Sequence, residues 1–502
     1  MTERVDSALG DHLSRVLALS PESIAVEYQG QKVRWGELGA AAEQIEALLR
    51  QAGIDGLAPI GWAARNRPAA VAGFIALLVH EHMVAPLRPA YALASFREDI
   101  TAQRLAAVIG EPEDWSGEGV VAAAQAAGTL GIEVSGPPFA VRLVPGLEAV
   151  GPGPHREPMP GYVIERMTSG TTGAPKRIPV RREVLIPALK AGAPKKDGAP
   201  RPLSLQRSPA LLFKPFSHAG GMYGLLLALY QARPIVLFEK FNVADWVAAV
   251  KTYRPKAASL VPTMIRMLLD SDTDPADIGS LLAIRSGTAP LEPALQEEFE
   301  ARFGIPILID YSAAEFIGGL AGWSLEDYRS FGADKRGSVG RAKSDVALRT
   351  VDPETFGAQS AGETGLIEVK SDRYGPDWIR TSDLAAIDSD GFIFLKGRTD
   401  DAINRGGFKV LPEDVAAILR RHPGVGDAAV VGRADPRLGQ VPIAAIEVAE
   451  GSAAPETAAL DALVREHLPA YMAPVDYLFV ASLPRTASLK ISRPELKALL
   501  GL

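Results

Sequence analysis

The chain has 502 residues, of which 47% are hydrophobic and 23% are charged, a composition typical of a folded globular protein and not of a disordered one. Its formal net charge of −7 argues against a nucleic-acid-binding protein, which usually has a basic surface. It contains no cysteine, which excludes disulfide bonds and thiolate metal sites.

The first residues lack the apolar segment of a secretory signal. The most apolar run, residues 69–79, is shorter than the roughly 20 residues that span a membrane. We therefore expect a cytoplasmic protein in which this run forms a buried helix.

Helices and strands alternate along the first 340 residues, with a surface loop expected at 191–202. The predicted elements are a helix at 71–78, strands at 83–86 and 161–167, a helix at 246–252, a strand at 257–261, a helix at 262–270 and a strand at 305–310. This βα alternation predicts parallel-rich sheets flanked by helices, which is an α/β fold.

Strands dominate after residue 340, and Ser389-Asp390-Gly391 indicates a hairpin. The predicted elements there are strands at 364–370, 385–388 and 392–395, a helix at 412–421, strands at 427–432 and 443–449, a helix at 458–467, a strand at 477–480 and a helix at 493–500. We expect a large N-terminal domain, residues 1–399, that includes a β-rich subdomain. Residues 400–502 are expected to form a small, mobile α+β domain.

The segment 168–176 has the sequence TSGTTGAPK. It combines three kinds of residue that can bind a polyphosphate: glycines, hydroxyl residues and a lysine. Glycines allow the backbone to approach an anion, hydroxyls donate hydrogen bonds, and lysine adds a positive charge. It is not a Walker A loop, because its two glycines are too close and no Ser or Thr follows the lysine. A flexible polar turn is the alternative interpretation.

This segment resembles the phosphate loop of the adenylate-forming (ANL) superfamily, which includes acyl-CoA and aryl-CoA synthetases, adenylation domains and luciferases. Further segments resemble the later motifs of that family in the same order, whereas the chain before residue 168 matches less sharply. These segments are SGTAPL (286–291), DYSAAE (310–315), WIRTSDL (378–384), GRTDD and GGFKV (397–410) and PRTASLKI (484–491).

The resemblance implies two half-reactions, in which a carboxylate attacks ATP to give an acyl-adenylate and pyrophosphate, and a thiol then displaces AMP. It implies that ATP and AMP are bound by Thr168, Ser169, Gly170, Thr171, Thr172, Gly173, Lys176, Ser286, Gly287, Thr288, Asp310, Tyr311, Asp383 and Arg398.

Within that set the resemblance assigns roles. Tyr311 is expected to stack on adenine and Asp310 to accept a hydrogen bond from the adenine amino group. Asp383 and Arg398 are expected to bind the ribose.

Three residues are expected to be catalytic by the same resemblance. Lys490 offsets the charge that develops between the carboxylate and the α-phosphate. Glu315 binds Mg²⁺, a hard cation that prefers oxygen ligands. His218 stands between the acyl pocket and the path of the thiol.

Asp400 is the expected hinge of the C-terminal domain, and Gly406, Gly407, Phe408 and Lys409 are expected to line a tunnel for the pantetheine arm of CoA. The alternative for the two glycines is an ordinary turn. The expected acyl pocket suits an apolar or aromatic acid of modest size. Its residues are His218, Ala219, Gly220, Met222 and Ala313, with Gly287 and Thr288.

Four positions depart from the family pattern. Ala314 replaces a threonine, Ser382 and Leu489 replace glycines, and Gln440 replaces a glutamate. Because the charged residues are kept, we expect an active enzyme.

We therefore expect an AMP-forming acid–thiol ligase that uses ATP, Mg²⁺ and coenzyme A. The alternative is an adenylate-forming enzyme that loads a carrier protein or another nucleophile. A non-catalytic nucleotide-binding regulator is a third hypothesis, supported only by Ala314 and Leu489.

Overall fold

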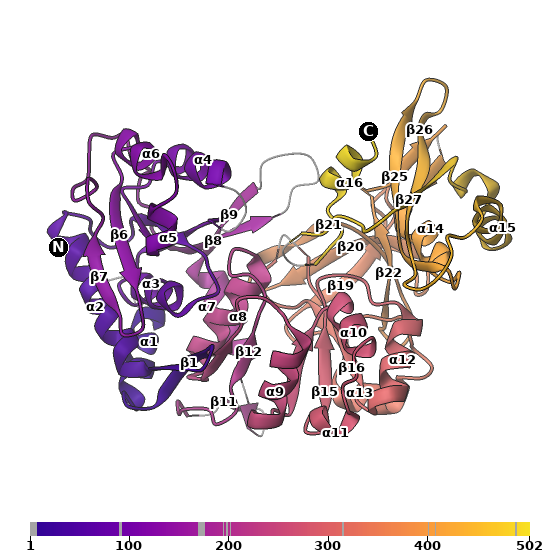
Figure 1. Cartoon of the computed structure of the whole chain (residues 1–502). Helices are drawn as coiled ribbons and strands as arrows, with labels where there is room; N and C mark the ends of the chain where they lie inside the picture. Colours follow the sequence, from indigo (N-terminus) through magenta and orange to yellow (C-terminus); the bar gives the residue numbers. More distant parts are fainter. Residues whose placement is uncertain are drawn as a thin grey trace. The chain divides into compact units, whose positions relative to one another are not determined.

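The computed structural model describes residues 8–89, 93–168, 176–193, 195–196, 199–200, 202–313, 316–399, 401–406, 408–486 and 489–502 (Figure 1). The described residues divide into two compact units. Unit 1 lies within residues 1–170, 174–259 and 271–282, and unit 2 lies within residues 260–270 and 283–502.

A seven-stranded sheet forms the centre of unit 1, with the strand order β7-β6-β5-β3-β4-β8-β9. Five neighbouring strands are parallel, and β7 and β9 pair antiparallel at the two edges. The strands are β3 (Pro59–Ala63), β4 (Met83–Leu87), β5 (Ala107–Gly110), β6 (Leu130–Ser135), β7 (Ala140–Leu143), β8 (Tyr162–Thr168) and β9 (Lys176–Arg181).

Helices cover both faces of this sheet. Alternate residues of each strand point to opposite sides, so two neighbouring residues of β3 contact helices on the two faces. Trp62 of β3 packs on Phe74 of α3 with ring centroids 4.7 Å apart, whereas its neighbour Ala63 belongs to a core cluster with Phe96 of α4. The helices around the sheet are α1 (Ala8–Leu19), α2 (Trp35–Gln51), α3 (Pro68–Val79), α4 (Leu93–Gln103), α5 (Pro112–Trp115), α6 (Val120–Ala126) and α7 (Arg182–Gly192). The buried helix predicted at 71–78 is confirmed as α3.

A second sheet of unit 1 has the order β12-β13-β1-β2. The predicted loop at 191–202 is not wholly irregular, because it holds the short pair β10-β11. The remaining elements are β1 (Ile24–Tyr28), β2 (Gln31–Arg34), β10 (Lys195–Lys196), β11 (Ala199–Pro200), β12 (Ala210–Leu212), β13 (Ile235–Leu237), α8 (Ala219–Tyr230), α9 (Val243–Tyr253), α11 (Pro275–Ile278) and, at the border of the units, β14 (Ala257–Leu260).

Unit 2 begins with parallel strands and continues with an antiparallel sheet of order β19-β20-β21-β22. The strand predicted at 385–388 is only the end of β21, which has 13 residues. Its elements are α10 (Pro262–Leu269), β15 (Ala283–Ser286), α12 (Pro293–Phe303), β16 (Ile307–Tyr311), β17 (Ala321–Gly322), α13 (Leu325–Phe331), β18 (Arg341–Ala342), β19 (Ala347–Val351), β20 (Thr364–Ser371), β21 (Gly375–Ile387) and β22 (Ile393–Arg398).

The last hundred residues of unit 2 form an α+β region, as predicted. One core cluster joins α14 and α15 to the sheet through residues such as Val415, Ile446 and Leu460. The elements are β23 (Ile403–Arg405), β24 (Phe408–Val410), α14 (Pro412–Leu419), β25 (Val425–Asp435), β26 (Gly439–Val448), α15 (Thr457–His467), the 3₁₀ turn η1 (Ala470–Met472), β27 (Asp476–Val480) and α16 (Arg493–Leu499). The predicted mixed α/β architecture is therefore confirmed.

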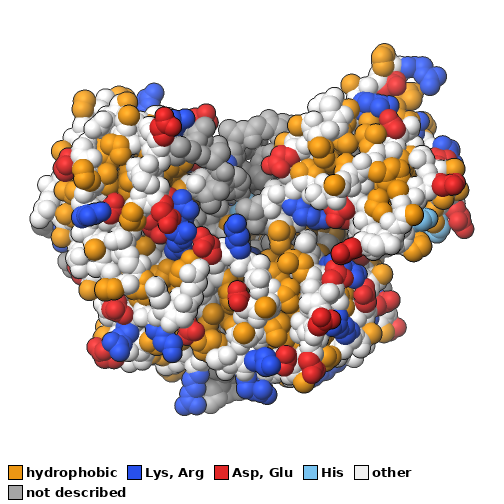
Figure 2. All heavy atoms as spheres, in the orientation of Figure 1, with side chains coloured by type: hydrophobic (Ala, Val, Ile, Leu, Met, Phe, Trp, Pro, Cys, Tyr) orange, Lys and Arg blue, Asp and Glu red, His pale blue; other side chains and the backbone are white. Residues whose placement is uncertain are grey.

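Acidic and basic side chains are interspersed on the face of the molecule seen in Figure 2. This mixture fits the modest net charge of −7. Among the described residues, no helix is both long and apolar enough to cross a bilayer.

Two glycines of α8 provide a test of the packing around the start of this helix. A Cβ at Gly221 would lie 2.1 Å from the Pro215 carbonyl oxygen, whereas a Cβ at Gly224 has its nearest neighbour at 3.7 Å. We expect Gly221→Ala to lower the free energy of unfolding by about 1–3 kcal/mol through overpacking. Gly224→Ala should raise it by about 0.5–1 kcal/mol, because alanine is the better helix former. Urea denaturation of both variants measures the difference, and a change of the same sign in both would contradict the packing.

Candidate active site

Asp383 contacts two other predicted nucleotide-binding residues, Tyr311 and Arg398. It lies on β21 opposite Arg398 of β22 and is buried. The Tyr311 hydroxyl, at the end of β16, donates to Asp383 Oδ2 at 2.6 Å, and Arg398 Nη1 donates to Oδ1 at 3.3 Å. The structure thus brings a carboxylate, a phenol and a guanidinium together at the position expected for the ribose.

Ser382, which departs from the family glycine, takes part in this arrangement. Its hydroxyl accepts a hydrogen bond from Arg398 Nη2, and its carbonyl accepts one from the Thr399 amide at 2.8 Å. The substitution therefore adds a contact that holds the guanidinium of Arg398. Sequence reasoning noted the position but not this role.

Asp310 is surrounded by cations that the sequence analysis did not identify. Arg285 Nη1 lies 2.9 Å from Oδ1 and 2.8 Å from Oδ2, and Lys343 Nζ lies 3.9 Å from Oδ1. Burial lowers the pKa of Lys343, an effect that the nearby Asp310 carboxylate opposes. Arg285 directly precedes the SGTAPL segment, which was the available signal, whereas nothing in the sequence pointed to Lys343.

The SGTAPL segment approaches Asp310 closely. A Cβ at Gly287 would lie 2.8 Å from the Asp310 carbonyl oxygen, so only glycine fits without movement. Ser286 is buried, and its hydroxyl has no hydrogen-bond partner among the described residues. Thr288 follows with φ of +75°. An unpaired buried hydroxyl beside a nucleotide motif fits a ligand that supplies the missing partner.

Several predicted site residues lie outside the described residues. They are Ser169, Gly170, Thr171, Thr172 and Gly173 of the phosphate loop, Ala314 and Glu315, the hinge residue Asp400 and Gly407. The backbones of Thr168 and Lys176 pair with each other at the ends of β8 and β9, so the loop connects two antiparallel strands. The roles of the phosphate-loop residues, of Asp400 and of Gly407 stay predictions, as does the Mg²⁺ site at Glu315.

Lys490 lies on a tight turn between two short antiparallel segments, where Arg485 pairs with Ile491. The Thr486 amide donates to the Lys490 carbonyl at 2.7 Å, and the Leu489 amide donates to the Thr486 carbonyl at 2.8 Å. Leu489 has φ of +62°, in the left-handed region that favours glycine. The departure at Leu489 therefore places a branched side chain where the backbone suits glycine.

Lys490 is exposed to solvent, but the pKa of its ammonium is lowered. Desolvation by the surrounding protein lowers its pKa, and the positive charge of Arg398 acts in the same direction. The predicted catalytic lysine and the predicted ribose-binding arginine therefore interact.

His218 and three of the predicted pocket residues lie in unit 1 at the start of α8. His218 is the N-cap residue of α8, and its amide donates to the Pro215 carbonyl at 2.9 Å. Met222 is buried, and Ala219 and Gly220 form the first turn. The other predicted pocket residues, Gly287, Thr288 and Ala313, belong to unit 2, and Ala313 is buried. The acyl pocket stays a prediction.

Asn66, which sequence analysis did not identify, braces the segment before His218. Its buried side-chain amide donates to the carbonyls of Lys214 and Phe238 and accepts from the Phe216 amide at 2.9 Å. A single buried side chain therefore fixes the backbone that leads to the histidine.

The predicted tunnel residue Gly406 follows β23, and Phe408 begins β24, which pairs antiparallel with β23. Gly406 has φ of +58°, and its amide donates to the Leu438 carbonyl at 2.7 Å. The Phe408 ring is exposed and stacks on Tyr471 with centroids 4.8 Å apart. Of Lys409 only the backbone, in β24, is described. Gln440, a departure, accepts from the Asn404 amide at 3.2 Å.

Comparison with known proteins shows to which family the chain belongs. The AMP-binding enzyme profile matches residues 13–374, and the profile of the AMP-binding enzyme C-terminal domain matches residues 414–490. The chain belongs to the AMP-binding enzyme family. The resemblance to adenylate-forming enzymes is thereby confirmed.

A curated relative of this AMP-binding enzyme is the 2-succinylbenzoate–CoA ligase of Bacillus velezensis, 30% identical over 354 residues that cover 66% of this chain and 68% of the relative. The 4-coumarate–CoA ligase 2 of Nicotiana tabacum is 26% identical over 66% of this chain and 64% of its own length. The chain thus matches about two thirds of the length of these relatives. They support the prediction of an AMP-forming acid–thiol ligase.

Among solved structures, amide bond synthetase McbA from Marinactinospora thermotolerans has a TM-score of 0.76 and 25% identity, over 98% of this chain and 99% of that chain. ATP-bound MatB from Rhodopseudomonas palustris has a TM-score of 0.80 and 22% identity, over 98% of both chains. The latter likeness shows that the whole chain has the fold of this superfamily.

The strained turn before Lys490 is testable. An L-residue in the left-handed region costs about 1–2 kcal/mol, which glycine avoids. We therefore expect Leu489→Gly to be more stable than Leu489→Ala by about 1 kcal/mol, because both variants lose the side chain but only glycine relaxes the backbone. Guanidinium denaturation measures this difference, and equal stability of the two variants would show that φ of Leu489 is not positive.

Proposed function

We propose that this AMP-binding enzyme activates a carboxylic acid with ATP and transfers the acyl group to the thiol of coenzyme A. The observation that carries the proposal is the Asp383 cluster, in which Tyr311 and Arg398 hold the two oxygens of one buried carboxylate. A carboxylate fixed in this way can accept hydrogen bonds from the two hydroxyls of a ribose.

In the first half-reaction, a carboxylate oxygen of the acid bonds to the α-phosphorus of ATP and pyrophosphate leaves. Two anions must meet, so catalysis depends on positioning and on compensation of charge. Lys490 supplies the positive charge, and Arg398 holds Asp383 against the ribose. Glu315 would hold Mg²⁺, a hard cation that prefers oxygen ligands and would offset the negative charge of the phosphates.

In the second half-reaction, the sulfur of the thiol bonds to the acyl carbon and AMP leaves. The proposed path for the pantetheine arm passes Gly406, Gly407, Phe408 and Lys409, with His218 near the acyl group. Support comes from the curated relatives, which are named CoA ligases, and from the exposed ring of Phe408. The small residues at the start of α8 favour an apolar or aromatic acid of modest size.

A second candidate acceptor is an amine, which would form an amide in place of a thioester. It is favoured by the likeness to an amide bond synthetase, which has 25% identity over nearly the whole chain. A carrier protein that presents the same pantetheine thiol is the third acceptor compatible with the proposed path.

We also infer that residues 1–399 and 400–502 act as two domains with Asp400 as the hinge. The two family profiles support this division, because the proposed boundary lies in the gap between residue 374 and residue 414.

The first experiment incubates the purified protein with ATP, Mg²⁺ and a pool of aromatic and aliphatic acids. Three parallel reactions contain CoA, a pool of primary amines, or no acceptor, and mass spectrometry identifies the products. We expect one acyl-CoA together with AMP in the first reaction. If the second reaction gives an amide and the first gives no acyl-CoA, the acceptor is an amine and not the thiol of CoA. If no reaction gives acid-dependent AMP, the protein is not an adenylate-forming enzyme.

Lys490 provides a test of the mechanism. We expect Lys490→Ala to slow acid-dependent ATP–pyrophosphate exchange by about 10²–10³-fold, because a charge that stabilises the transition state is lost. Only the ammonium form is active. Its pKa is lowered in the enzyme without ATP, so kcat/KM for ATP in the exchange reaction should decline with rising pH at a value below the usual lysine pKa of about 10.4.

The matched control is Lys490→Arg, since a guanidinium stays charged over the whole pH range in which a lysine titrates. This variant should be slower but should lose the alkaline decline. An unchanged alkaline decline in Lys490→Arg would assign that titration to another group.

A further inference from the structure

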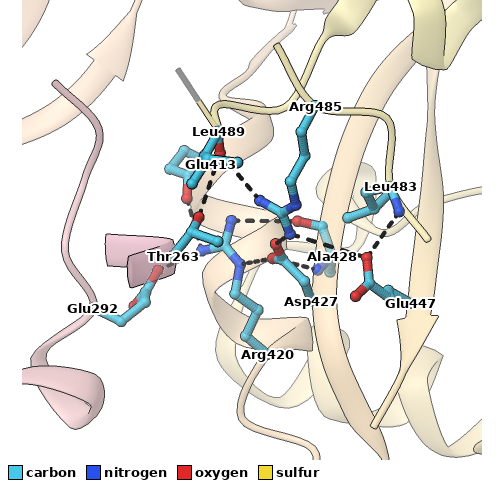
Figure 3. A network of polar contacts seen from close by, with 10 residues as sticks. All are labelled: Thr263, Glu292, Glu413, Arg420, Asp427, Ala428, Glu447, Leu483, Arg485 and Leu489. Carbon is cyan, nitrogen blue, oxygen red and sulfur yellow. Dashed lines mark hydrogen bonds and ion pairs between the residues drawn. The ribbon is translucent and has the colours of Figure 1, made fainter. Parts of the chain in front are cut away.

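Two arginines of the C-terminal region link the turn that carries Lys490 to the helix α12. Figure 3 shows the network, which lies within unit 2. Arg485 Nη2 lies 2.5 Å from Asp427 Oδ2, and Arg420 Nε lies 3.0 Å from Asp427 Oδ1. Asp427, on β25, therefore bridges the two guanidinium groups.

Arg420 continues the network toward α12. Its Nη1 donates to Glu413 at 2.8 Å and also to Glu292, the N-cap residue of α12. Arg420 thus holds three carboxylates from three separate segments. The side chains of Arg420 and Asp427 are about one-fifth exposed, so their charge-assisted hydrogen bonds are partly shielded from solvent.

Two donors contact the strained residue of the Lys490 turn. The Leu489 carbonyl accepts from Thr263 Oγ1 of α10 at 3.3 Å and from Arg485 Nη1 at 3.5 Å. Residues in sparsely populated backbone conformations persist only where their surroundings hold them. Leu489, with φ of +62°, directly precedes Lys490, so the contacts that hold the Leu489 peptide also orient Lys490.

We propose that Arg485 is a positioning residue for Lys490, and that Asp427, Arg420 and Glu292 hold Arg485 in place for the first half-reaction. The inference rests on the proposed function and adds a role for Arg485 that the motif resemblance did not assign. The ion pairs between Glu292, Arg420, Asp427 and Arg485 are short. The hydrogen bonds from Arg485 and Thr263 to the Leu489 carbonyl are longer.

Lysine could not replace Arg485 fully. The guanidinium reaches Asp427 with one nitrogen and the Leu489 carbonyl with another. A lysine ammonium is a single point charge on a flexible chain and would keep the ion pair without the second fixed donor. The charge-conserving variant should therefore restore part of the activity.

The experiment measures acid-dependent ATP–pyrophosphate exchange in the full chain for Arg485→Gln, Arg485→Lys and the control Arg433→Gln. Arg433 of β25 forms a more exposed ion pair with Asp476 of β27 at 3.1 Å, so it tests the loss of an ion-paired arginine elsewhere in the C-terminal region. We expect kcat of exchange to fall about 10–100-fold in Arg485→Gln with KM for ATP nearly unchanged, because misplacement of a catalytic group lowers the rate and not the binding. Arg485→Lys should lie between Arg485→Gln and the wild type, and Arg433→Gln should match the wild type.

A second measurement keeps the test valid if Arg485→Gln does not fold. Glu292→Gln removes the far end of the network on a partly exposed side chain, and it should lower kcat of exchange in the same direction without a change in Tm. Unchanged kcat in both Arg485→Gln and Glu292→Gln would overturn the inference. So would a joint fall of Tm, kcat and ATP affinity in Arg485→Gln, because it indicates a structural role.

Failure of the proposed function gives a different result. In that case the wild type itself shows no acid-dependent exchange, and the variants cannot differ from it. Exchange in the wild type that is lost in Lys490→Ala establishes the half-reaction on which the comparison of Arg485 variants depends.

Discussion

The Asp383 carboxylate is the interaction on which the candidate site depends. It lies on the long strand β21 and connects Tyr311 at the end of β16 with Arg398 at the end of β22. Two sheets of unit 2 therefore meet at one buried charge. A buried carboxylate is costly unless it is paired and hydrogen-bonded, and here a phenol and a guanidinium stabilise it. The same two partners fix the direction of its oxygens, which is the requirement for recognition of a ribose.

Two of the departures from the family pattern have opposite structural consequences. Ser382 adds a hydroxyl that binds Arg398, so this substitution strengthens the cluster. Leu489 keeps the backbone conformation of a glycine without being one, so it introduces strain beside Lys490, the proposed catalytic residue. The arginine network on Asp427 offers the external support that such a turn requires. Neither departure therefore requires that the enzyme be inactive.

Sequence reasoning predicted only part of the elements and named no helix or strand before α3. Those that it did predict are short apolar runs bounded by glycine and proline, which define strands and helices locally. It shortened β21 to its last residues, since the polar stretch before Asp383 lacks the apolar alternation of a half-buried strand. It identified Tyr311, Asp383 and Arg398 from motifs but missed Arg285, Lys343 and Asn66. Their contacts depend on pairing between residues distant in the chain, which no local pattern records. Arg485 stood inside a recognised motif, yet only its contacts to Asp427 and Leu489 suggest a role.

Charge explains why the site suits an anionic nucleotide. Desolvation by the surrounding protein is the main cause that lowers the pKa of Lys490, and the positive charge of Arg398 lowers it further. The Asp383 carboxylate is already shared between Arg398 and Tyr311 and does not compensate both cations. An anion placed between them would relieve this repulsion and raise the pKa of Lys490 again. Binding of ATP would therefore favour the protonated lysine that the proposed first half-reaction requires, so that the substrate itself would prepare Lys490 for the role proposed for it.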